Sequence, residues 1–507
     1  MRRVPGNGQP LNSSPIDSPS NDLRKLLHIA TMIRKAKAMK RLTMLAAGAS
    51  LISAPLFAQS APVRPDQAEF RALYKELVET NTTLSSGSCT LAAERMGARL
   101  KAAGIANSQI TYYAVPEHPK DGGLVAVYPG TSKTLKPMLL LAHIDVVEAK
   151  RSDWTRDPFT LIEENGYFYG RGTVDDKAQA AIFTDTLVRF AKAGYKPKRT
   201  VKLALTCGEE SSGAFNGAQW LSNNKRDLID AEFALNEGGG GRSDGHGKVI
   251  VQTLQVGEKA YVDYTLTVTN IGGHSSQPIR ENAIYAMSDA LLKIRDHEFP
   301  LEMNEITRAF FTKAGTQRGD DIGKAMVALV NNPGDKQAET LVNTDKGFHS
   351  MLRTTCVATL IDGGHALNAL PQKVTANVNC RMFPGHTIAE NQALLEAVIG
   401  NPAIAFSVKV KDKPIAKVPA LNPAIIGPME KLVAQYYPGV PLIPAMSTGA
   451  TDAVYTGGVG IPTYGTPGYW TDPDGNGTHG LNERMEVKAL YTGRDYLFDL
   501  VKVLAGK

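Results

Sequence analysis

The chain has 507 residues, more than a single hydrophobic core usually organises, so we expect a main domain and a smaller one. With 43% hydrophobic and 21% charged residues and no repeat in its body, the composition excludes fibrous and disordered classes. Residues 1–58 hold nine lysines and arginines against two aspartates, a charge of +7, so the formal charge of +6 leaves −1 for the remainder. Nothing in that remainder resembles a basic stripe with interleaved aromatic residues, and we expect no nucleic-acid partner.

Residues 1–58 are interpreted as a leader that contains a signal peptide. A basic stretch at 35–41 precedes an apolar run at 42–57, and Ala58 is a small residue suited to cleavage. An uncleaved membrane anchor is the alternative, but the run is shorter than the ~20 residues that a spanning helix needs. We therefore expect an exported protein, periplasmic or secreted, with no stable membrane span; Met39 is an alternative start.

Four cysteines follow the leader: Cys89, Cys207, Cys356 and Cys380. None forms a Cys-x-x-Cys pair, which disfavours a zinc site built from thiolates. Export makes one disulfide feasible without requiring it, and the spacing assigns no pairing.

Helices and buried strands alternate from Asp66 onward. A first helix is predicted by the spacing of its apolar residues Phe70, Leu73, Tyr74, Leu77 and Val78. Short apolar runs predict strands at 124–128, 138–142, 201–206 and 232–235, with helices near 177–193 and 214–222. This order indicates an α/β fold with a mixed, mostly parallel sheet sandwiched by helices.

The pattern changes near residue 257, which predicts an inserted α+β lid domain over residues 257–414. Alternating apolar and polar residues predict half-solvated strands at 261–269 and 374–382, with a helix at 282–295. Residues 300–350 are extra material with helical character and no assigned role. The main domain would then comprise residues 59–256 and 415–507.

Acidic and imidazole side chains follow successive strands of the predicted main sheet. His143 and Asp145 close the run LLLAHIDVV, and their spacing of two places both side chains on one side, where Asp145 can orient a metal-binding imidazole. A structural histidine is the alternative. In YGRGTVDDK, Asp175 or Asp176 can bridge two cations, although an aspartate before a helix is equally expected as an N-cap.

Three further segments add to this set. Glu209 and Glu210 follow a buried strand in LTCGEESSG, at the end where open α/β sheets place their sites, although a glutamate pair alone is usually a solvated surface feature. Glu237 precedes four glycines in ALNEGGGG, which let the backbone approach a ligand but could equally form a plain flexible loop. His479 lies in GNGTHGLNER with Glu483 close behind, although a single loop histidine is usually only exposed. Together, nitrogen and carboxylate ligands without thiolates suit zinc, and a carboxylate shared between metals ~3.5–4 Å apart suits hydrolysis.

The order and sequences of these motifs resemble those of a family of di-zinc exopeptidases and deacylases. Its members include carboxypeptidase S, aminoacylase, succinyl-diaminopimelate desuccinylase and the glutamate-releasing carboxypeptidases. The resemblance runs from about Asp66 to the C-terminus, and the segment SDWTRDPFTLIEENGYFYGRGTVDDK is most similar to the carboxypeptidase S branch. It implies two zinc ions per subunit, with cobalt or manganese as alternatives. The implied ligands are the bridging Asp175, joined to Asp176 by a cis peptide bond, His143 and Glu237 for one ion, and Glu210 and His479 for the other.

The resemblance also implies roles in catalysis. Glu209 would be the general base, beside the orienting Asp145 expected above from its spacing to His143. His274, in IGGHSSQP, would polarise the scissile carbonyl, in many members across a dimer interface. Some branches have Asp at the position of Glu237, so Glu groups this chain with the aminoacylase and carboxypeptidase S side.

Substrate binding is implied for three further residues. Asn368, in GGHALNALP, and Arg381, in NVNCRMF, would hold the carboxylate of the substrate, although a structural salt bridge is the alternative for Arg381. Gly449, with Thr451 in STGATDAVY, would line the substrate cleft.

These expectations favour a zinc-dependent carboxypeptidase or dipeptidase that cleaves an amide bond next to a free carboxylate. An N-acyl-amino-acid deacylase needs the same metals, base and carboxylate clamp, and the sequence does not separate the two. A non-catalytic binding protein on a hydrolase scaffold is the alternative from another class. Proteins of that kind usually lack a metal ligand or the general base, whereas this sequence has all the expected ligands and the base. We expect a peptide or N-acyl amino acid as substrate and a homodimer formed through the inserted domain.

Overall fold

The computed structural model describes residues 64–211, 215–409 and 414–506, so the predicted leader lies outside the described residues. These described residues belong to one compact unit. Within the described ranges, no helix combines the length and apolar character needed to cross a bilayer.

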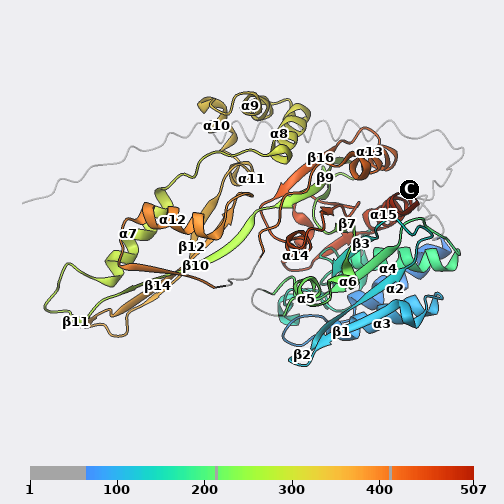
Figure 1. The fold of residues 1–507 in the computed structure, drawn as a ribbon, viewed down its shortest axis with the longest axis horizontal. Helices are drawn as coiled ribbons and strands as arrows, with labels where there is room; N and C mark the ends of the chain where they lie inside the picture. The colour runs from blue at the N-terminus through green and yellow to red at the C-terminus, as the bar shows by residue number, and fades with distance from the viewer. Residues whose placement is uncertain (1–63, 212–214, 410–413, 507) are drawn as a thin grey trace, which may run out of the picture. The chain divides into compact units, whose positions relative to one another are not determined.

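Ten strands form the main sheet: β1 (Ile110–Val115), β2 (His118–Tyr128), β3 (Met138–His143), β6 (Val201–Thr206), β7 (Phe233–Asn236), β8 (Gly240–Ser243), β9 (Val249–Glu258), β16 (Leu442–Ser447), β17 (Thr463–Gly465) and β18 (Trp470–Thr471). Their order is β1-β2-β6-β3-β7-β17-β9-β8-β18. β16 lies beside β9 (Figure 1). The centre, from β6 to β17, is parallel, whereas β1 and β2 run antiparallel at one side. The predicted mixed, mostly parallel sheet is confirmed.

Two cores cover the two faces of this sheet. Leu140 points into the larger core, while its neighbours Leu139 and Leu141 point into the other, as the alternation of side chains along a strand requires. The larger core is closed by α2 (Pro65–Val78), α3 (Cys89–Ala102), α4 (Lys177–Lys192), α13 (Pro423–Tyr436) and α15 (Val487–Gly506). The helices α5 (Gly217–Asn224) and α6 (Arg226–Ile229) cover the other face, with α14 (Ala453–Gly458) beside α5.

A second, antiparallel sheet has the order β12 (Thr355–Gly363), β14 (Lys373–Met382), β10 (Ala260–Thr269) and β15 (Ile404–Val408). The helices α7 (Ala283–Asp296) and α12 (Ile388–Ile399) contribute to the core on one of its faces. The inward residues of β14, namely Val374, Ala376, Val378 and Cys380, are buried as the alternation predicted. β11 (Gly273–His274) and β13 (Ala369–Leu370) form a separate two-stranded ribbon. The domain boundaries at 257 and 414 stay a prediction.

The extra segment at 300–350 is helical, as expected. It forms α8 (Glu305–Arg318), α9 (Asp321–Asn331), α10 (Lys336–Val342) and α11 (Lys346–Met351) around an apolar core of their own. Lys313 and Gln317 on α8 donate to the backbone carbonyls of Leu442 (3.4 Å) and Ile250 (2.7 Å), which attaches this cluster to the main sheet.

A third sheet joins β4 (Ile162–Glu164), β5 (Tyr167–Tyr169) and β19 (Arg484–Glu486). All four cysteines are paired, as Cys89–Cys207 and Cys356–Cys380, so the structure has two disulfides where the sequence suggested one. One helix starts later than predicted: α5 begins at Gly217, because the Asn216 side chain caps it by accepting from the Gln219 amide.

Candidate metal centre

Two groups of side chains suited to metal binding meet at the carboxyl end of the main sheet. Their positions follow from the strands: His143 ends β3, Glu237 follows β7, and Glu210 lies in the loop after β6. Within each group the candidate ligand atoms lie within 4.8 Å of one another. The groups are His143, Asp175 and Glu237, and Asp175, Glu210 and His479.

Asp175 belongs to both groups and lies between the two imidazoles. Its Oδ1 is 3.1 Å from Nε2 of His143, and its Oδ2 is 3.1 Å from Nε2 of His479. The same nitrogen of His479 is 3.0 Å from the Glu210 carboxylate, and Nε2 of His143 is 3.6 Å from Oε2 of Glu237. The structure therefore brings together all five side chains predicted as ligands, in the predicted grouping.

The segment that carries Asp175 enters α4 through a cis peptide bond between Asp175 and Asp176, as the resemblance implied. Asp176 occupies the N-cap position of α4, but its side chain makes no capping hydrogen bond. The N-cap interpretation therefore does not explain this aspartate pair.

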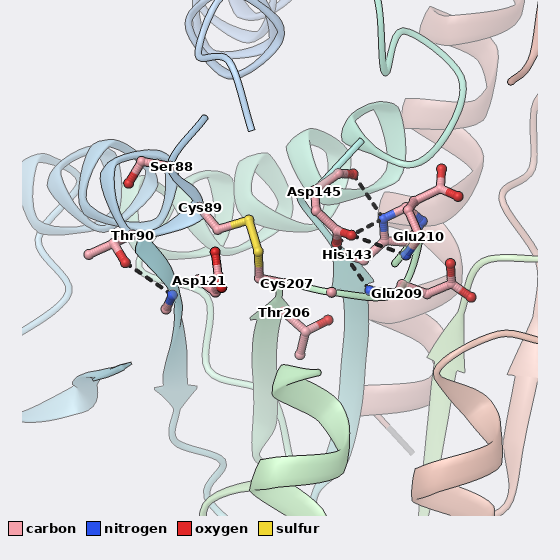
Figure 2. Close-up of a disulfide and its surroundings, with 12 residues drawn as sticks. Ser88, Cys89, Thr90, Asp121, His143, Asp145, Thr206, Cys207, Glu209 and Glu210 are labelled. Carbon is pink, nitrogen blue, oxygen red and sulfur yellow. Dashed lines mark hydrogen bonds and ion pairs between the residues drawn. A yellow bond between two sulfur atoms is a disulfide. The ribbon is translucent and has the colours of Figure 1, made fainter. Parts of the chain in front are cut away.

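Asp145 connects His143 to the loop that carries both glutamates. Nδ1 of His143 lies 3.1 Å from the main-chain carbonyl oxygen of Asp145 and 3.5 Å from its carboxylate. That carboxylate accepts hydrogen bonds from the amides of Glu209 (3.4 Å) and Glu210 (3.1 Å), as Figure 2 shows. We expected the carboxylate to orient the imidazole; the nearer contact is the backbone carbonyl, and the carboxylate mainly holds the glutamate loop.

The same loop is fixed at its start. The Cys89–Cys207 disulfide ties the first residue of α3 to the position just before Gly208 (Figure 2). Gly208 has φ +93°, and a Cβ there would lie 1.9 Å from the carbonyl oxygen of Phe215, so only glycine fits. The side chain of Glu209 thus extends from a backbone that is constrained at both its neighbours.

Asp452 is a residue that the sequence did not single out. It is buried, and its carboxylate accepts hydrogen bonds from Asn216 (2.8 Å) and Thr206 (2.9 Å). Asn216 also donates to the carbonyl oxygen of Gly208 at 3.2 Å. Asp452 therefore supports the glutamate loop through Asn216, and both of its contacts span more than two hundred positions of sequence.

The electrostatics of the centre show an excess of buried acids. Burial raises the pKa of Glu237 to about 7, and burial together with the charge of Glu237 raises that of Glu209 well above its usual value. Burial also raises the pKa of Asp176. For Asp175, burial is outweighed by the two imidazoles, which hold its pKa well below the usual range.

These carboxylates have too few positive partners. Oε1 of Glu237 and Oδ2 of Asp176 are buried and have no hydrogen-bond partner among the described residues. Buried charges are normally paired or coordinate metal ions, so the donor set fits two divalent cations that share Asp175. The role of these residues as ligands stays a prediction.

The glycine loop after β16 reaches the edge of this centre. Thr451 donates from its amide and its hydroxyl to Glu258, both at 3.0 Å, and its hydroxyl accepts from Asn236, the neighbour of Glu237, at 3.3 Å. Gly449 lies in the same loop, and its amide donates to the hydroxyl of Ser447. The role of this loop in lining a substrate cleft stays a prediction.

The remaining predicted substrate residues lie elsewhere. His274 lies on β11 opposite Ala369 of β13, and Asn368 directly precedes β13, where its carbonyl accepts from the amide of Ser275 at 2.9 Å. Arg381, on β14, lies with its guanidinium 4.5 Å from the ring centre of Tyr261. Nδ1 of His274 lies 2.7 Å from the hydroxyl of Ser276, and Nε of Arg381 donates to the side chain of Asn379 at 3.4 Å. Their roles stay predictions.

Comparisons with known proteins decide the family. The model of peptidase family M20/M25/M40 matches residues 139–503. The chain belongs to this family. It is therefore a hydrolase of the metallopeptidase class, and the resemblance inferred from the motifs is confirmed.

Named relatives agree with this assignment. The chain is 27% identical over 381 residues to N-fatty-acyl-amino acid synthase/hydrolase PM20D1 of Homo sapiens, covering 74% of this chain and 75% of that protein. It is 27% identical over 390 residues to probable carboxypeptidase S-like 2 of Dictyostelium discoideum, covering 75% and 74%. Among solved structures, the M20 family metallo-carboxypeptidase Sso-CP2 from Sulfolobus solfataricus shares the fold, with a TM-score of 0.67 at 16% identity and coverage of 86% of this chain and 99% of that one.

Proposed function

We propose that this chain is a two-metal exopeptidase that hydrolyses an amide bond next to a free carboxylate, as a carboxypeptidase or a dipeptidase. The observation that carries the proposal is the position of Asp175, whose two oxygens each lie 3.1 Å from a different imidazole. A carboxylate held in this way suits two metal ions that act together in hydrolysis. The carboxypeptidase names of two relatives support the choice of substrate class.

Under this proposal each group holds one divalent cation. His143 and Glu237 would complete one site, Glu210 and His479 would complete the other, and Asp175 would contribute one oxygen to each. When bound, the cations would polarise the scissile carbonyl and lower the pKa of the attacking water. Zinc suits these nitrogen and oxygen donors, and cobalt and manganese accept the same set.

Glu209 is the residue we assign to proton transfer. Its carboxylate accepts a proton from the attacking water and passes it to the leaving nitrogen. Asp145 supports this role because it binds the amide of Glu209 and keeps the backbone of the loop in place.

Adjacent glutamates provide a matched test of this assignment. Glu209→Gln should keep both metal ions and lower kcat by about 10²–10⁴-fold, because the amide cannot accept the proton. Glu210→Gln, one residue away, should instead lower the metal content. Metal analysis and kcat measured on both purified variants would decide, and a fully active Glu209→Gln protein would refute the role.

The preference for a free carboxylate is assigned to Arg381 and Asn368, with His274 acting on the scissile carbonyl. A guanidinium binds a carboxylate through two parallel hydrogen bonds, which a lysine cannot reproduce. Arg381→Lys should therefore raise KM for a dipeptide much more than it changes kcat. The same dipeptide with an amidated C-terminus should be a poor substrate for the wild type, and equal rates for the free and amidated forms would exclude a carboxylate clamp.

The second candidate is an N-acyl-amino-acid hydrolase. The similarity to N-fatty-acyl-amino acid synthase/hydrolase PM20D1 favours it, and both reactions use the same base and clamp. The experiment is a panel of dipeptides and N-acyl amino acids assayed with added zinc. A preference of kcat/KM for long acyl chains would select the hydrolase, and a preference for dipeptides would select the peptidase.

We also propose a homodimer formed through the second sheet. Its edge strand β12 exposes Val357, Leu360 and Ile361 by 59%, 63% and 61%, and apolar patches on a sheet edge commonly mark interfaces. Leu360→Glu should convert the dimer to a monomer in light scattering after size exclusion. Leu91→Glu, at an exposed leucine of α3, serves as the control and should leave the mass unchanged.

Export is the last part of the proposal. Two disulfides that use all four cysteines support it, because disulfides persist mainly in oxidising compartments. Sequencing the N-terminus of the protein recovered from the periplasm or medium would locate the cleavage site, which we expect near Ala58.

A further inference from the structure

Glu483 is a fully buried carboxylate whose two oxygens are both occupied. Oε1 accepts from the amides of Val174 (2.7 Å) and Asp175 (3.1 Å). Oε2 accepts from the amide of Gly172 (3.0 Å) and from Nη1 of Arg171 (2.6 Å). One side chain thus organises the whole backbone turn that presents the bridging Asp175.

Arg171 extends this contact back toward His479. Its Nη2 donates to the carbonyl oxygen of Gly480 at 2.7 Å, while Nη1 holds Glu483. The pairing continues along the chain, because the amide of Gly170 donates to the carbonyl of Glu483 and β5 pairs with β19. Two segments separated by more than three hundred residues are therefore fastened side by side, one carrying Asp175 and the other His479.

Gly172 shows how closely this turn is fitted. It has φ +83°, and a Cβ would lie 2.8 Å from Cγ1 of Val146 and 2.9 Å from Cδ of Lys177. A side chain at this position would press on Val146 and Lys177 and would strain the backbone whose amide donates to Glu483. The turn is thus specified by its glycine as well as by the ion pair.

A role in stability alone would not explain this arrangement. A buried ion pair is by itself weak evidence for stability, because desolvation offsets much of the attraction. The chain contains a comparable pair, Arg494–Asp185, with side chains exposed by only 1% and 5%, which joins α15 to α4 and touches no candidate ligand. The Arg171–Glu483 pair differs because Glu483 binds the backbone amide of the candidate ligand Asp175, and Arg171 binds the carbonyl of Gly480, next to the candidate ligand His479.

We infer that Glu483 and Arg171 are positioning residues that fix the distance between Asp175 and His479 and so set the affinity for the second metal ion. This inference rests on the proposed two-metal function. The effect should be unequal, because His143 and Glu237 are placed by β3 and β7, whereas Asp175 and His479 both depend on the fastened segments. The ion at Asp175, Glu210 and His479 should therefore weaken more than its neighbour.

The test measures Zn²⁺ binding to metal-free protein by calorimetry with a competing chelator, together with the Tm of each metal-free variant. His143→Ala and His479→Ala first identify which binding event belongs to which site. Glu483→Gln should then weaken the event assigned to His479 by about 10–100-fold, the usual effect of losing a group that orients a ligand. Arg171→Lys keeps the charge but cannot reach Glu483 and Gly480 together, so it should weaken the same event.

Asp185→Asn is the matched control, which should lower Tm and leave both affinities unchanged. The inference is overturned if Glu483→Gln and Arg171→Lys bind two Zn²⁺ ions as wild type does, or if Asp185→Asn weakens binding equally. If Glu483→Gln does not fold, Arg171→Lys decides by the same criterion. Wild-type protein that binds fewer than two ions would instead refute the proposed function, so the two failures are distinct.

Discussion

Lys259 is a buried cation at the turn from β9 to β10. Its ammonium donates to the carbonyl of Ser350 (3.0 Å) and the hydroxyl of Thr355 (3.1 Å), and burial, with the charges of Arg381 and Arg353, lowers its pKa to about 7. In the unfolded chain the pKa stays near 10.5, so between pH 7 and 10 the unfolded state binds more protons. Stability from this residue should therefore rise with pH through that window.

Comparison of wild type with Lys259→Met isolates this contribution. The difference in the free energy of unfolding, wild type minus variant, should increase by up to roughly 1.4 kcal/mol per pH unit between pH 7 and 10. Urea unfolding of both proteins at pH 7, 8 and 9 measures the difference. If the stability of the two proteins changed in parallel with pH, the pKa of Lys259 would not be lowered in the native state.

At the scale of single residues, the sequence predicted the side chains that follow strands. His143, Glu209 and Glu237 were found because the carboxyl ends of parallel strands converge at one edge of a sheet. Asp452 was missed because its partners Thr206 and Asn216 are distant in sequence and a loop aspartate has no local signal. The hydrogen bonds of Glu483 to the backbone of residues 172–175 were missed for the same reason.

At the scale of elements, the Cys89–Cys207 disulfide joins α3 to the loop that carries Glu209, across 118 residues of sequence. Its loss should cost about 2–5 kcal/mol of stability and should also lower kcat, because the loop loses its anchor. Cys356–Cys380 closes only 24 residues and lies in the other sheet. The double serine variants of each pair, compared in Tm and kcat, test this, and equal kcat losses would contradict it.

The first helix was predicted well, because its apolar spacing is regular. All five apolar residues predicted for the first helix are buried on α2. The predicted range for β2, 124–128, was too short. The strand begins at His118, and its first half is polar and contains glycine, so no apolar run marks it. The strands β8, β17 and β18 are too short, at two to four residues, for any periodicity to appear.

At the scale of the whole molecule, removal of the metal ions should lower stability. The centre concentrates buried carboxylates that repel one another, and ligand binding to the native state adds about 4 kcal/mol when the free ion is at 1,000 times its Kd. Calorimetry should show a lower Tm after chelation and recovery after Zn²⁺ is added. Chelator saturated with zinc is the control, and an unchanged Tm after chelation would argue against occupied sites.

The fold class and family were accessible from the sequence because they depend on the order of many motifs. The two disulfides and the attachment of α8 to Leu442 and Ile250 were not, since both require knowing which distant segments meet. Patterns within one element are local, whereas contacts between elements emerge only from the assembled core.

The Cys356–Cys380 bond has a consequence for assembly. It fastens the edge strand β12 covalently to β14, its neighbour within the same chain. An edge strand secured in this way cannot be exchanged between two copies, so domain swapping through β12 is excluded while the bond is intact. If two copies pair along β12, each copy must contribute its own intact four-stranded sheet to the interface.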